Sequence, residues 1–461
     1  MEIITNNKLH QKISMLPGTG RRVAFKTLGC RLNQYETDAL ATQFDQAGYQ
    51  IVDFNDQADV VVVNTCTVTN KSDQKSRNLI NQAARNNKGA VVVVTGCMAN
   101  NHKEQLESEK KITYVVENNR KGNIRELVDA HLRGEIVHPS GIAGDVFHYS
   151  SVDKSLHTRS AIKIQDGCDN YCTFCIIPTV RGRAVSRPLP QIVEYVRQTL
   201  DNGFKELVIT GVNIGRYHWK DKRFEDVVEA ILEIPGDFRV RISSLEPDGF
   251  GDRFYDLFKH PKLAPHLHLC LQSGSDKVLL RMRRMYSLKQ FADILERFRS
   301  IRPNFNFTTD MIVGFPGETD ADFRASLEAV QRFQFSHVHT FKYSVRQGTR
   351  AERMENQVPE KLKAERSAIL RELSEKNQMK IYSSFIGKTQ RVLIEKIDRN
   401  GFATGYGEHY IPFRFYARQL EKNTFHNVRA VRTEVFDEKV RLFGQIVQTR
   451  SSKEFKLDRL Q

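Results

Sequence analysis

At 461 residues, the chain is too long for one ordinary hydrophobic core, and we expect two to three domains. Its 70 Lys and Arg residues outnumber 55 Asp and Glu residues, giving a formal net charge of +15, which favours a polyanionic partner such as nucleic acid. No apolar run is long enough to span a bilayer and the N-terminus lacks a signal-peptide core, so we expect a cytoplasmic protein. Seven cysteines, an odd number, argue against a disulfide scaffold and for metal binding or catalysis.

The N-terminal part of the chain predicts a parallel, doubly wound α/β domain. Residues 1–20 are polar and aperiodic, so we expect a flexible tail there, and the domain is predicted over 21–136. Short apolar runs alternate with segments of helical spacing, the pattern of buried parallel strands joined by helices. Strands are predicted at 23–27, 60–63, 91–94 and 112–116, and helices at 33–47, 71–87, 103–110 and 124–132.

Three cysteines each follow the end of a predicted strand in this domain. Cys30 follows the first strand, Cys66 the second and Cys97 the third. The carboxyl ends of parallel strands share one edge, where ligands bind, and helix N-termini there favour thiolates. We therefore predict that the three converge on a metal cluster. The alternative is that each is a small buried hydrophobic residue.

A second α/β region is predicted over residues 154–380, after a linker at 137–153. Strands are expected at 161–164, 207–210, 239–243, 267–271, 306–314 and 337–343, with helices at 189–200, 279–285, 290–299 and 320–333. Six β/α units, rather than eight, indicate an open partial barrel, (β/α)6, related to the TIM barrel. Its site would lie at the carboxyl ends of the strands. A charged helix at 361–379 is expected to be a connector.

The loop at residues 168–175 carries the strongest chemical signal. Cys168, Cys172 and Cys175 follow a C-x3-C-x2-C spacing just after the first strand of the partial barrel. Three thiolates on one short loop can ligate three irons of a [4Fe-4S] cluster and leave the fourth iron open. A zinc site is the alternative, but no suitably spaced fourth ligand is present.

Polar, glycine-bearing loops follow the other strands of the partial barrel and predict a ligand pocket beside the cysteine loop. The spacing of that loop, with an aromatic residue before its last cysteine, resembles the radical S-adenosylmethionine (SAM) enzymes, and the resemblance implies that the ligand is SAM. Any one of these loops could instead be ordinary turn or capping chemistry. The candidate cofactor-binding residues are Phe174, Thr210, Gly211, Asn213, Ser243, Ser244, Glu246, Gln272, Ser273, Asp310 and Gly314.

Three arginines after the cysteine loop are candidate phosphate ligands. Arg181, Arg183 and Arg187 could contact RNA phosphates or the SAM carboxylate, and the alternative is a solvated basic loop. Cys270 lies within an apolar strand, where a packed cysteine is expected.

The last part of the chain predicts a small β-barrel over 381–448, followed by a tail at 449–461. Short strands are expected at 391–394, 402–406, 428–432, 434–436 and 441–447. Residues 381–461 hold 15 Lys and Arg against 9 Asp and Glu, a net charge of +6. Aromatic residues among these charges suit RNA recognition, or they form the core of the barrel. They are Phe385, Tyr406, Tyr410, Phe413 and Phe415.

Several motifs together resemble the radical SAM methylthiotransferases over about residues 22–447. They are TLGCRLNQYE at 27–36, NTCTV at 64–68, TGC at 95–97, the cysteine loop with CIIP at 175–178 and RGR at 181–183, LQSGS at 271–275 and VGFPGET at 313–319. The C-terminal barrel resembles the family's TRAM domain, an OB-like fold.

The resemblance implies an enzyme with two [4Fe-4S] clusters that consumes two SAM molecules. The cluster of Cys168, Cys172 and Cys175 would bind and cleave SAM to a 5′-deoxyadenosyl radical, and the other would carry the sulfur. The motifs around Cys30 and Arg181 most resemble the group that acts on threonylcarbamoyladenosine in tRNA. Its reaction inserts a methylthio group at C2 of N6-threonylcarbamoyladenosine (t6A) at position 37.

Other substrates and one non-enzymatic function stay open. Relatives act on isopentenyladenosine at position 37 or on an aspartate of a ribosomal protein. The non-enzymatic alternative is an iron–sulfur RNA-binding scaffold. The enzyme reading implies binding of the tRNA anticodon stem-loop, and external electron and sulfur donors.

Overall fold

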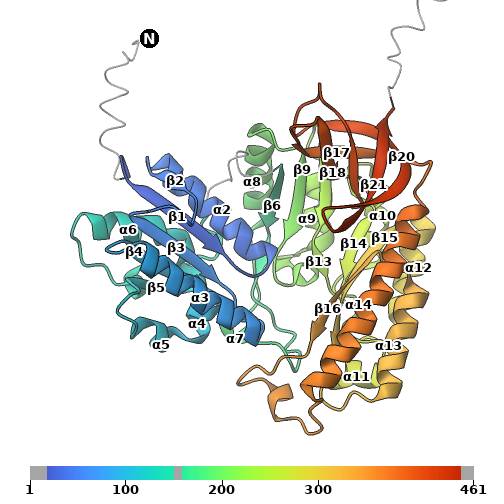
Figure 1. Ribbon diagram of the computed structural model, residues 1–461, viewed down its shortest axis with the longest axis horizontal. Helices are drawn as coiled ribbons and strands as arrows, with labels where there is room; N and C mark the ends of the chain where they lie inside the picture. The colour runs from blue at the N-terminus through green and yellow to red at the C-terminus, as the bar shows by residue number, and fades with distance from the viewer. Residues whose placement is uncertain (1–17, 150–157, 448–461) are drawn as a thin grey trace, which may run out of the picture.

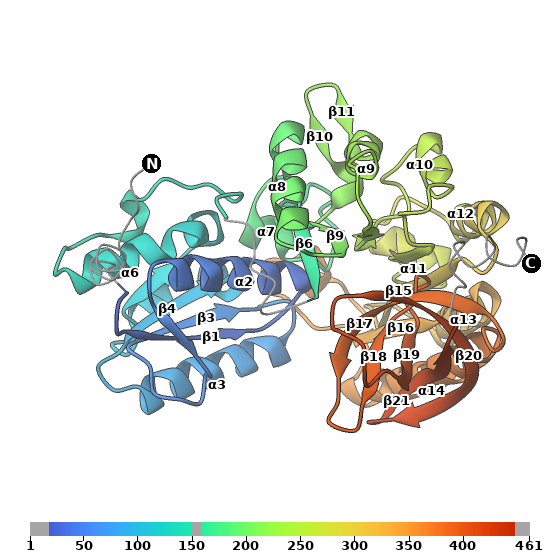
Figure 2. The same ribbon diagram turned by 90° about the horizontal axis from the view of Figure 1, so that it is seen from above.

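The computed structural model describes residues 18–149 and 158–447 (Figure 1). Residues 1–17 of the tail predicted at 1–20, the tail predicted at 449–461, and residues 150–153 of the linker predicted at 137–153 lie outside the described residues. Three groups of elements follow one another: an N-terminal sheet with its helices, a central set of parallel strands, and a closed C-terminal barrel (Figures 1 and 2). No described helix is both long and apolar enough to cross a membrane.

The N-terminal sheet is parallel with strand order β2-β1-β3-β4-β5. The predicted strands are present, and the short, exposed edge strand β2 was missed because it has no apolar run. The helix predicted at 103–110 is α5, which ends at Glu107, and the short helix α4 before it was missed. The elements are β1 (Arg22–Thr27), α2 (Arg31–Gln46), β2 (Gln50–Val52), β3 (Val60–Thr65), α3 (Asn70–Asn86), β4 (Val91–Gly96), α4 (Cys97–Asn101), α5 (Lys103–Glu107), β5 (Tyr114–Val116), η1 (Asn118–Asn123) and α6 (Ile124–Leu132).

All six strand positions predicted in the central part are occupied, and all pair in parallel. They form two sheets, β12-β9-β6 and β13-β14-β15-β16, and the chain passes from one to the other at Ser243. The strands are β6 (Arg159–Lys163), β9 (Glu206–Thr210), β12 (Arg239–Ile242), β13 (Ser244–Leu245), β14 (His266–Leu269), β15 (Asn306–Val313) and β16 (His337–Lys342). The result is the predicted partial barrel.

Helices cover the outer face of these strands, where alternate apolar side chains pack (Figure 2). They are α8 (Leu189–Asp201), α9 (Phe224–Leu232), α10 (Asp252–Leu257), α11 (Asp276–Arg281), α12 (Leu288–Ile301) and α13 (Asp320–Phe333). The prediction of a helix at 279–285 was wrong in its boundaries, because Arg283 adopts φ 60° and turns the chain. The predicted connector helix, α14 (Glu360–Ser383), packs against β16, where Ser374 Oγ accepts a hydrogen bond from Val338 N.

The C-terminal strands form a closed barrel of order β17-β18-β19-β21-β20. Its strand β19 was missed, and the strands predicted at 428–432 and 434–436 are one bulged strand, β20. The barrel strands are β17 (Thr389–Ile397), β18 (Phe402–Tyr406), β19 (Pro412–Tyr416), β20 (Phe425–Phe436) and β21 (Lys439–Ile446). Phe385, Phe413 and Phe415 are buried in its core, so for these three the second of the two alternatives, a place in the barrel core, is correct.

The C-terminal barrel covers the amino ends of the central strands (Figure 2). Arg239 Nη1 donates to the carbonyl oxygen of Arg391 at 2.7 Å, and Arg241 Nη2 donates to that of Gly407 at 2.6 Å. Both arginines pair with Glu206 of β9, which is fully buried. Burial opposes ionisation of this carboxyl, but the neighbouring arginines outweigh it and lower the pKa of Glu206 to about 2.

Candidate active site between two cysteine sets

Cys30, Cys66 and Cys97 meet at the carboxyl edge of the N-terminal sheet, as predicted. Cys30 precedes α2, Cys66 follows β3, and Cys97 begins α4. A Cβ on Gly29 would lie 3.1 Å from Cys66 Sγ, so the loops of Cys30 and Cys66 are in contact. Burial raises the pKa of Cys97, and the charge of Cys30 adds to this, which is a further sign of proximity.

Asn33, in the first turn of α2, holds two of these loops in place. Its amide Nδ2 donates to the carbonyl oxygen of Leu28 at 2.8 Å and to that of Thr65 at 3.0 Å. Those residues precede Cys30 and Cys66 by two and one positions. One buried side chain therefore fixes the spacing of two thiols.

The second set, Cys168, Cys172 and Cys175, lies on one loop between β7 (Gln165–Asp166) and α7 (Ile177–Arg181). Arg284 Nη1 lies 3.3 Å from Cys172 Sγ, and Asn213 Nδ2 lies 3.7 Å from Cys168 Sγ. Burial raises the pKa of Cys175 to about 12, and the other two cysteines of the loop add to the effect. A cationic metal cluster would displace these thiol protons, as thiolate ligation requires.

Neither set is arranged for a single metal ion. Tetrahedral zinc with bonds of about 2.3 Å would hold its sulfur ligands roughly 4 Å apart. Among the described residues, the one group with all ligand atoms within 4.8 Å of one another is His268, Asp310 and His339, which contains no cysteine. The wider spacing of both cysteine sets fits a polynuclear iron–sulfur cluster and disfavours zinc.

Helix α7 connects the two sets, because it begins two residues after Cys175 and packs against α4, which begins at Cys97. Cys97, Ile176 and Val180 form one buried apolar cluster. Asn118 Nδ2 also donates to the carbonyl oxygen of Val180 at 3.0 Å. The two cysteine sets therefore lie on either side of a short, packed element.

A buried group of charges lies beneath α7, between the N-terminal sheet and the partial barrel. Arg181 Nη1 lies 3.1 Å from Glu36 Oε1 and 3.0 Å from Asp166 Oδ2. Lys163 pairs with both carboxylates and Lys121 pairs with Glu36. Burial opposes ionisation of Glu36, but the three cations outweigh it and hold its pKa well below the usual range. Sequence reasoning missed this group.

Two of the three arginines predicted to contact RNA are buried, so that prediction was wrong for them. The Arg181 side chain is 1% exposed, within the ion pairs just described. Arg187 is buried and its guanidinium packs 4.7 Å from the ring centroid of Tyr195. Arg183 is 77% exposed and pairs with Asp169 at 2.7 Å, so it alone is available to a partner.

The predicted SAM-pocket residues surround the cysteine loop unevenly. Asn213 contacts Cys168, and Glu246 pairs with Arg284, which contacts Cys172. Most of the other residues lie at or next to strand ends: Thr210, Ser243 and Gln272 are buried, Ser244 is exposed and Gly211 abuts Gln165. Phe174 lies on the cysteine loop itself and packs towards Phe315.

Local contacts within the chain already account for two further predicted pocket residues, Ser273 and Gly314. Ser273 Oγ accepts a hydrogen bond from Ser275 N. A Cβ on Gly314 would lie 2.3 Å from Lys363 Cγ, so packing against α14 already requires glycine there.

The interior of the partial barrel is polar below the cysteine loop. Asp310 Oδ1 lies 3.2 Å from His268 Nε2, and the ring of His339 lies 5.5 Å from that of His268. Cys270 is buried as expected, and it faces this interior, where burial and the charges of Glu246 and Asp310 raise its thiol pKa.

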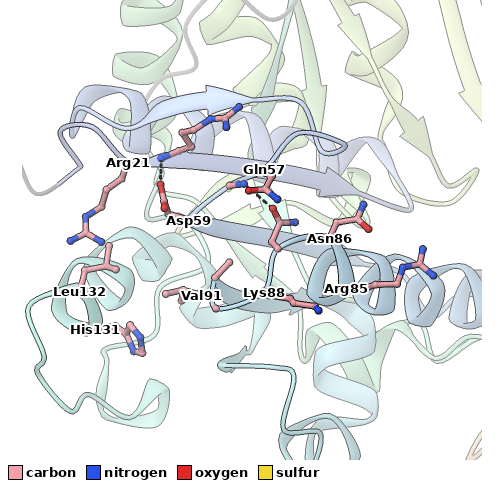
Figure 3. A pocket seen from close by; sticks show the side chains of 14 residues that line it. Arg21, Gln57, Asp59, Arg85, Asn86, Lys88, Val91, His131 and Leu132 are labelled. Atoms are coloured by element: carbon pink, nitrogen blue, oxygen red, sulfur yellow. Dashed lines mark hydrogen bonds between the residues drawn. The ribbon is translucent and has the colours of Figure 1, made fainter.

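A separate pocket of about 580 Å³ opens at the opposite edge of the N-terminal sheet (Figure 3). It lies at the amino ends of β1, β3 and β4 and is lined by Arg21, Arg22, Arg85 and Lys88 among others. None of the predicted site residues lines it, so it is not the active site.

Comparisons with known proteins agree with this arrangement. The model described as Uncharacterized protein family UPF0004 matches residues 22–117, and that of the Radical SAM superfamily matches 162–330. A solved structure of the radical SAM methyltransferase TsrM from Kitasatospora setae aligns with a TM-score of 0.53 at 15% identity. The alignment covers 72% of this chain and 74% of TsrM, and it shows a shared fold.

Full-length relatives are more similar. Threonylcarbamoyladenosine tRNA methylthiotransferase MtaB of Thermotoga maritima is 38% identical, over 89% of this chain and 94% of that protein. MtaB of Bacillus subtilis is 37% identical over 85% and 90%. The tRNA-2-methylthio-N(6)-dimethylallyladenosine synthase of Maricaulis maris is 34% identical over 83% and 88%. The chain therefore belongs to the radical SAM methylthiotransferases, enzymes that use [4Fe-4S] clusters and SAM, and within them to the MtaB branch.

Proposed function

We propose that this enzyme attaches a methylthio group to C2 of t6A at position 37 of tRNA. The names of the MtaB relatives, at 36–38% identity, support this substrate. The structural observation that carries the proposal is the pair of cysteine sets joined through α7, which open onto a polar barrel interior. A polar interior suits the threonylcarbamoyl group better than an isopentenyl group, which is apolar.

We assign one cluster to each cysteine set. Cys168, Cys172 and Cys175 would hold the cluster that binds SAM, and Cys30, Cys66 and Cys97 the cluster that carries the sulfur. When bound, the first cluster would pass an electron from an external donor to SAM and so cleave it, the second cluster would supply the sulfur, and another SAM molecule would supply the methyl group. The chain contributes positive charge next to each set, from Arg284 at Cys172 and from Arg181 near Cys97.

The strand ends of the partial barrel would position SAM beside its cluster. Asn213 Oδ1 is buried without a hydrogen-bond partner among the described residues, as expected of an atom that meets a ligand. The remaining candidates are Phe174, Thr210, Gly211, Ser243, Ser244, Glu246, Gln272, Ser273, Asp310 and Gly314.

The same proposal gives each part of the chain a role. Residues 21–136 would carry the sulfur cluster, 154–380 the SAM chemistry, and the barrel at 381–448 would be a TRAM-like RNA-binding domain. The anticodon stem-loop, bound partly through exposed Arg183, would be the tRNA part recognised. External electron and sulfur donors would complete the cycle, in the cytoplasm.

The test is an anaerobic assay on the reconstituted enzyme with anticodon stem-loops that carry t6A or isopentenyladenosine. We expect mass spectrometry to show the methylthio product on t6A, together with methionine and 5′-deoxyadenosine. A product only on isopentenyladenosine, or on a ribosomal-protein aspartate, would favour those alternatives. RNA binding without formation of 5′-deoxyadenosine would favour the non-enzymatic alternative, an iron–sulfur RNA-binding scaffold.

A further inference from the structure

The arginine next to Cys30 has no carboxylate partner among the described residues, and it lies within electrostatic range of a polar group inside the partial barrel. Arg31 directly follows Cys30 and is exposed, and no carboxylate of the described residues pairs with it. Its guanidinium is nevertheless held in place: Nη2 donates to Tyr410 Oη at 2.6 Å, and the group lies 5.5 Å from the centroid of that ring. A fixed guanidinium without an anion is a ready site for one.

Ring contacts with both the partial barrel and the C-terminal barrel fix the position of Tyr410. Its ring stacks 4.7 Å from that of His266 and 4.7 Å from that of Tyr406. The hydrogen bond to Tyr410 therefore holds the Arg31 guanidinium near the polar side chains on β14, β15 and β16. The C-terminal barrel, which supplies Tyr410, thus shapes the site without touching a cysteine.

The polar row is the group of His268, Asp310 and His339. Thr308 Oγ1 lies 3.0 Å from His268 Nδ1, and Asp310 Oδ1 lies 3.2 Å from His268 Nε2, so the pair His268–Asp310 is oriented. His339 has no hydrogen-bond partner among the described residues; part of it is open to solvent, but its ring packs against those of His268 and His337. Burial, with the charge of Arg31 among the smaller causes, lowers the pKa of His339 to about 4, so this imidazole is neutral near pH 7.

We propose that Arg31 and the group His268–Asp310–His339 form the specificity site for the substituent on the target adenosine, which rests on the proposed function. Arg31 binds the threonyl carboxylate, the feature that an isopentenyl group lacks. The histidine–aspartate group binds the uncharged polar atoms, the hydroxyl and the urea N–H groups. An apolar substituent would leave these buried or fixed polar groups without partners, which costs affinity.

Placement between the two cysteine sets supports this assignment. Arg31 directly follows Cys30 of one set. Asp310, Glu246 and Cys172 of the other set all raise the pKa of the Cys270 thiol, so Asp310 lies near that second set. A substituent held there would present the adenine ring between the two clusters.

The experiment removes either the positive charge of Arg31, by substitution with methionine, or the negative charge of the threonyl carboxylate, by conversion to its methyl ester. Anticodon stem-loops with t6A or with its methyl ester are methylthiolated by wild type, Arg31→Met and the control Arg253→Met. Arg253 pairs with Asp226 on the outer surface. Wild type and the control should prefer the acid over the ester by roughly 10- to 100-fold in kcat/KM, mainly through KM. In Arg31→Met the two substrates should become equal within about threefold. Iron content establishes that each variant is folded and loaded.

Three outcomes would overturn the inference. If Arg31→Met keeps the preference for the acid, the carboxylate is bound elsewhere while the proposed function stands. If wild type modifies only isopentenyladenosine, the proposed function itself fails. If wild type holds one zinc per chain that His339→Ala loses, the group is a metal site.

Discussion

Arg181 Nη2 donates a hydrogen bond of 2.7 Å to Asn33 Oδ1, and this contact links the two cysteine sets mechanically. Arg181 ends α7, which follows Cys175, whereas Asn33 holds the loops of Cys30 and Cys66. A shift of either part would be transmitted to the other. The spacing between the clusters is therefore set by buried polar contacts rather than by a flexible linker.

The buried charges beneath α7 should dominate the stability of the interface. Arg181→Met leaves Glu36 and Asp166 with fewer cations, and breaking such a buried pair costs about 3–5 kcal/mol. Denaturant unfolding should show this loss. The matched control Arg183→Met, two residues away and exposed, should cost less than about 1 kcal/mol. Equal effects of the two substitutions would contradict the structural role of Arg181.

Removing the thiols of one set should remove one cluster. The Cys30/Cys66/Cys97→Ala variant should fall from about eight irons per chain to about four after anaerobic reconstitution. Cys270→Ala is the control and should keep about eight, because Cys270 belongs to neither set. About four irons in the wild type would eliminate the second cluster.

Gly96 should be intolerant of a side chain. Its φ is +96°, and a Cβ would lie 2.3 Å from the carbonyl oxygen of Thr65, next to Cys97. Gly96→Ala should destabilise the chain by at least about 3 kcal/mol, and sulfur-cluster loading should fall. Gly89→Ala shares the positive φ, +83°, but its Cβ has no neighbour within 4 Å. It should cost only about 1 kcal/mol by the same measurement, and similar losses would refute the steric argument.

The attachment of the C-terminal barrel should weaken at acid pH. The pKa of Glu206 is lowered from 4.5 to about 2 in the folded chain, so its stabilising effect is full above pH 4.5 and is lost as the pH falls towards 2. The shift corresponds to about 3 kcal/mol. The stability difference between wild type and Glu206→Gln should therefore shrink as the pH is lowered from 6 to 3. A difference that does not vary with pH would contradict this.

The sequence predicted the strands well where burial on both faces leaves a continuous apolar run, as at 60–63 and 91–94. It missed β2 and β19, since neither carries such a run. Cysteine spacing was equally informative, because thiolate ligation constrains residue type and order. The buried charges were not foreseeable, because in the sequence Glu36 looks like a residue on the exposed face of a helix. Only the structure shows that α2 is buried along most of its length between the N-terminal sheet and the barrel (Figure 2).

The basic residues were misjudged for the same reason. Arg181 and Arg187 have the composition of an RNA-binding loop, but long-range packing places carboxylates and an aromatic ring around them. Local pattern cannot distinguish a guanidinium that meets phosphate from one that meets Glu36. Arg183, which lies between them, faces solvent.

Arg239 and Arg241 donate hydrogen bonds to backbone carbonyl oxygens of the C-terminal barrel, those of Arg391, Gly407 and Glu408. Carbonyl oxygens are present whatever the side chains are, so these bonds do not depend on the side chains at 391, 407 and 408, whereas Tyr410 and Asn423 contact the rest of the chain through their side chains. Substitutions on the face of the barrel that points away from these contacts should therefore leave its attachment intact. Grafting a barrel from a relative onto this chain should preserve its seating, provided that the backbone path of those loops is kept.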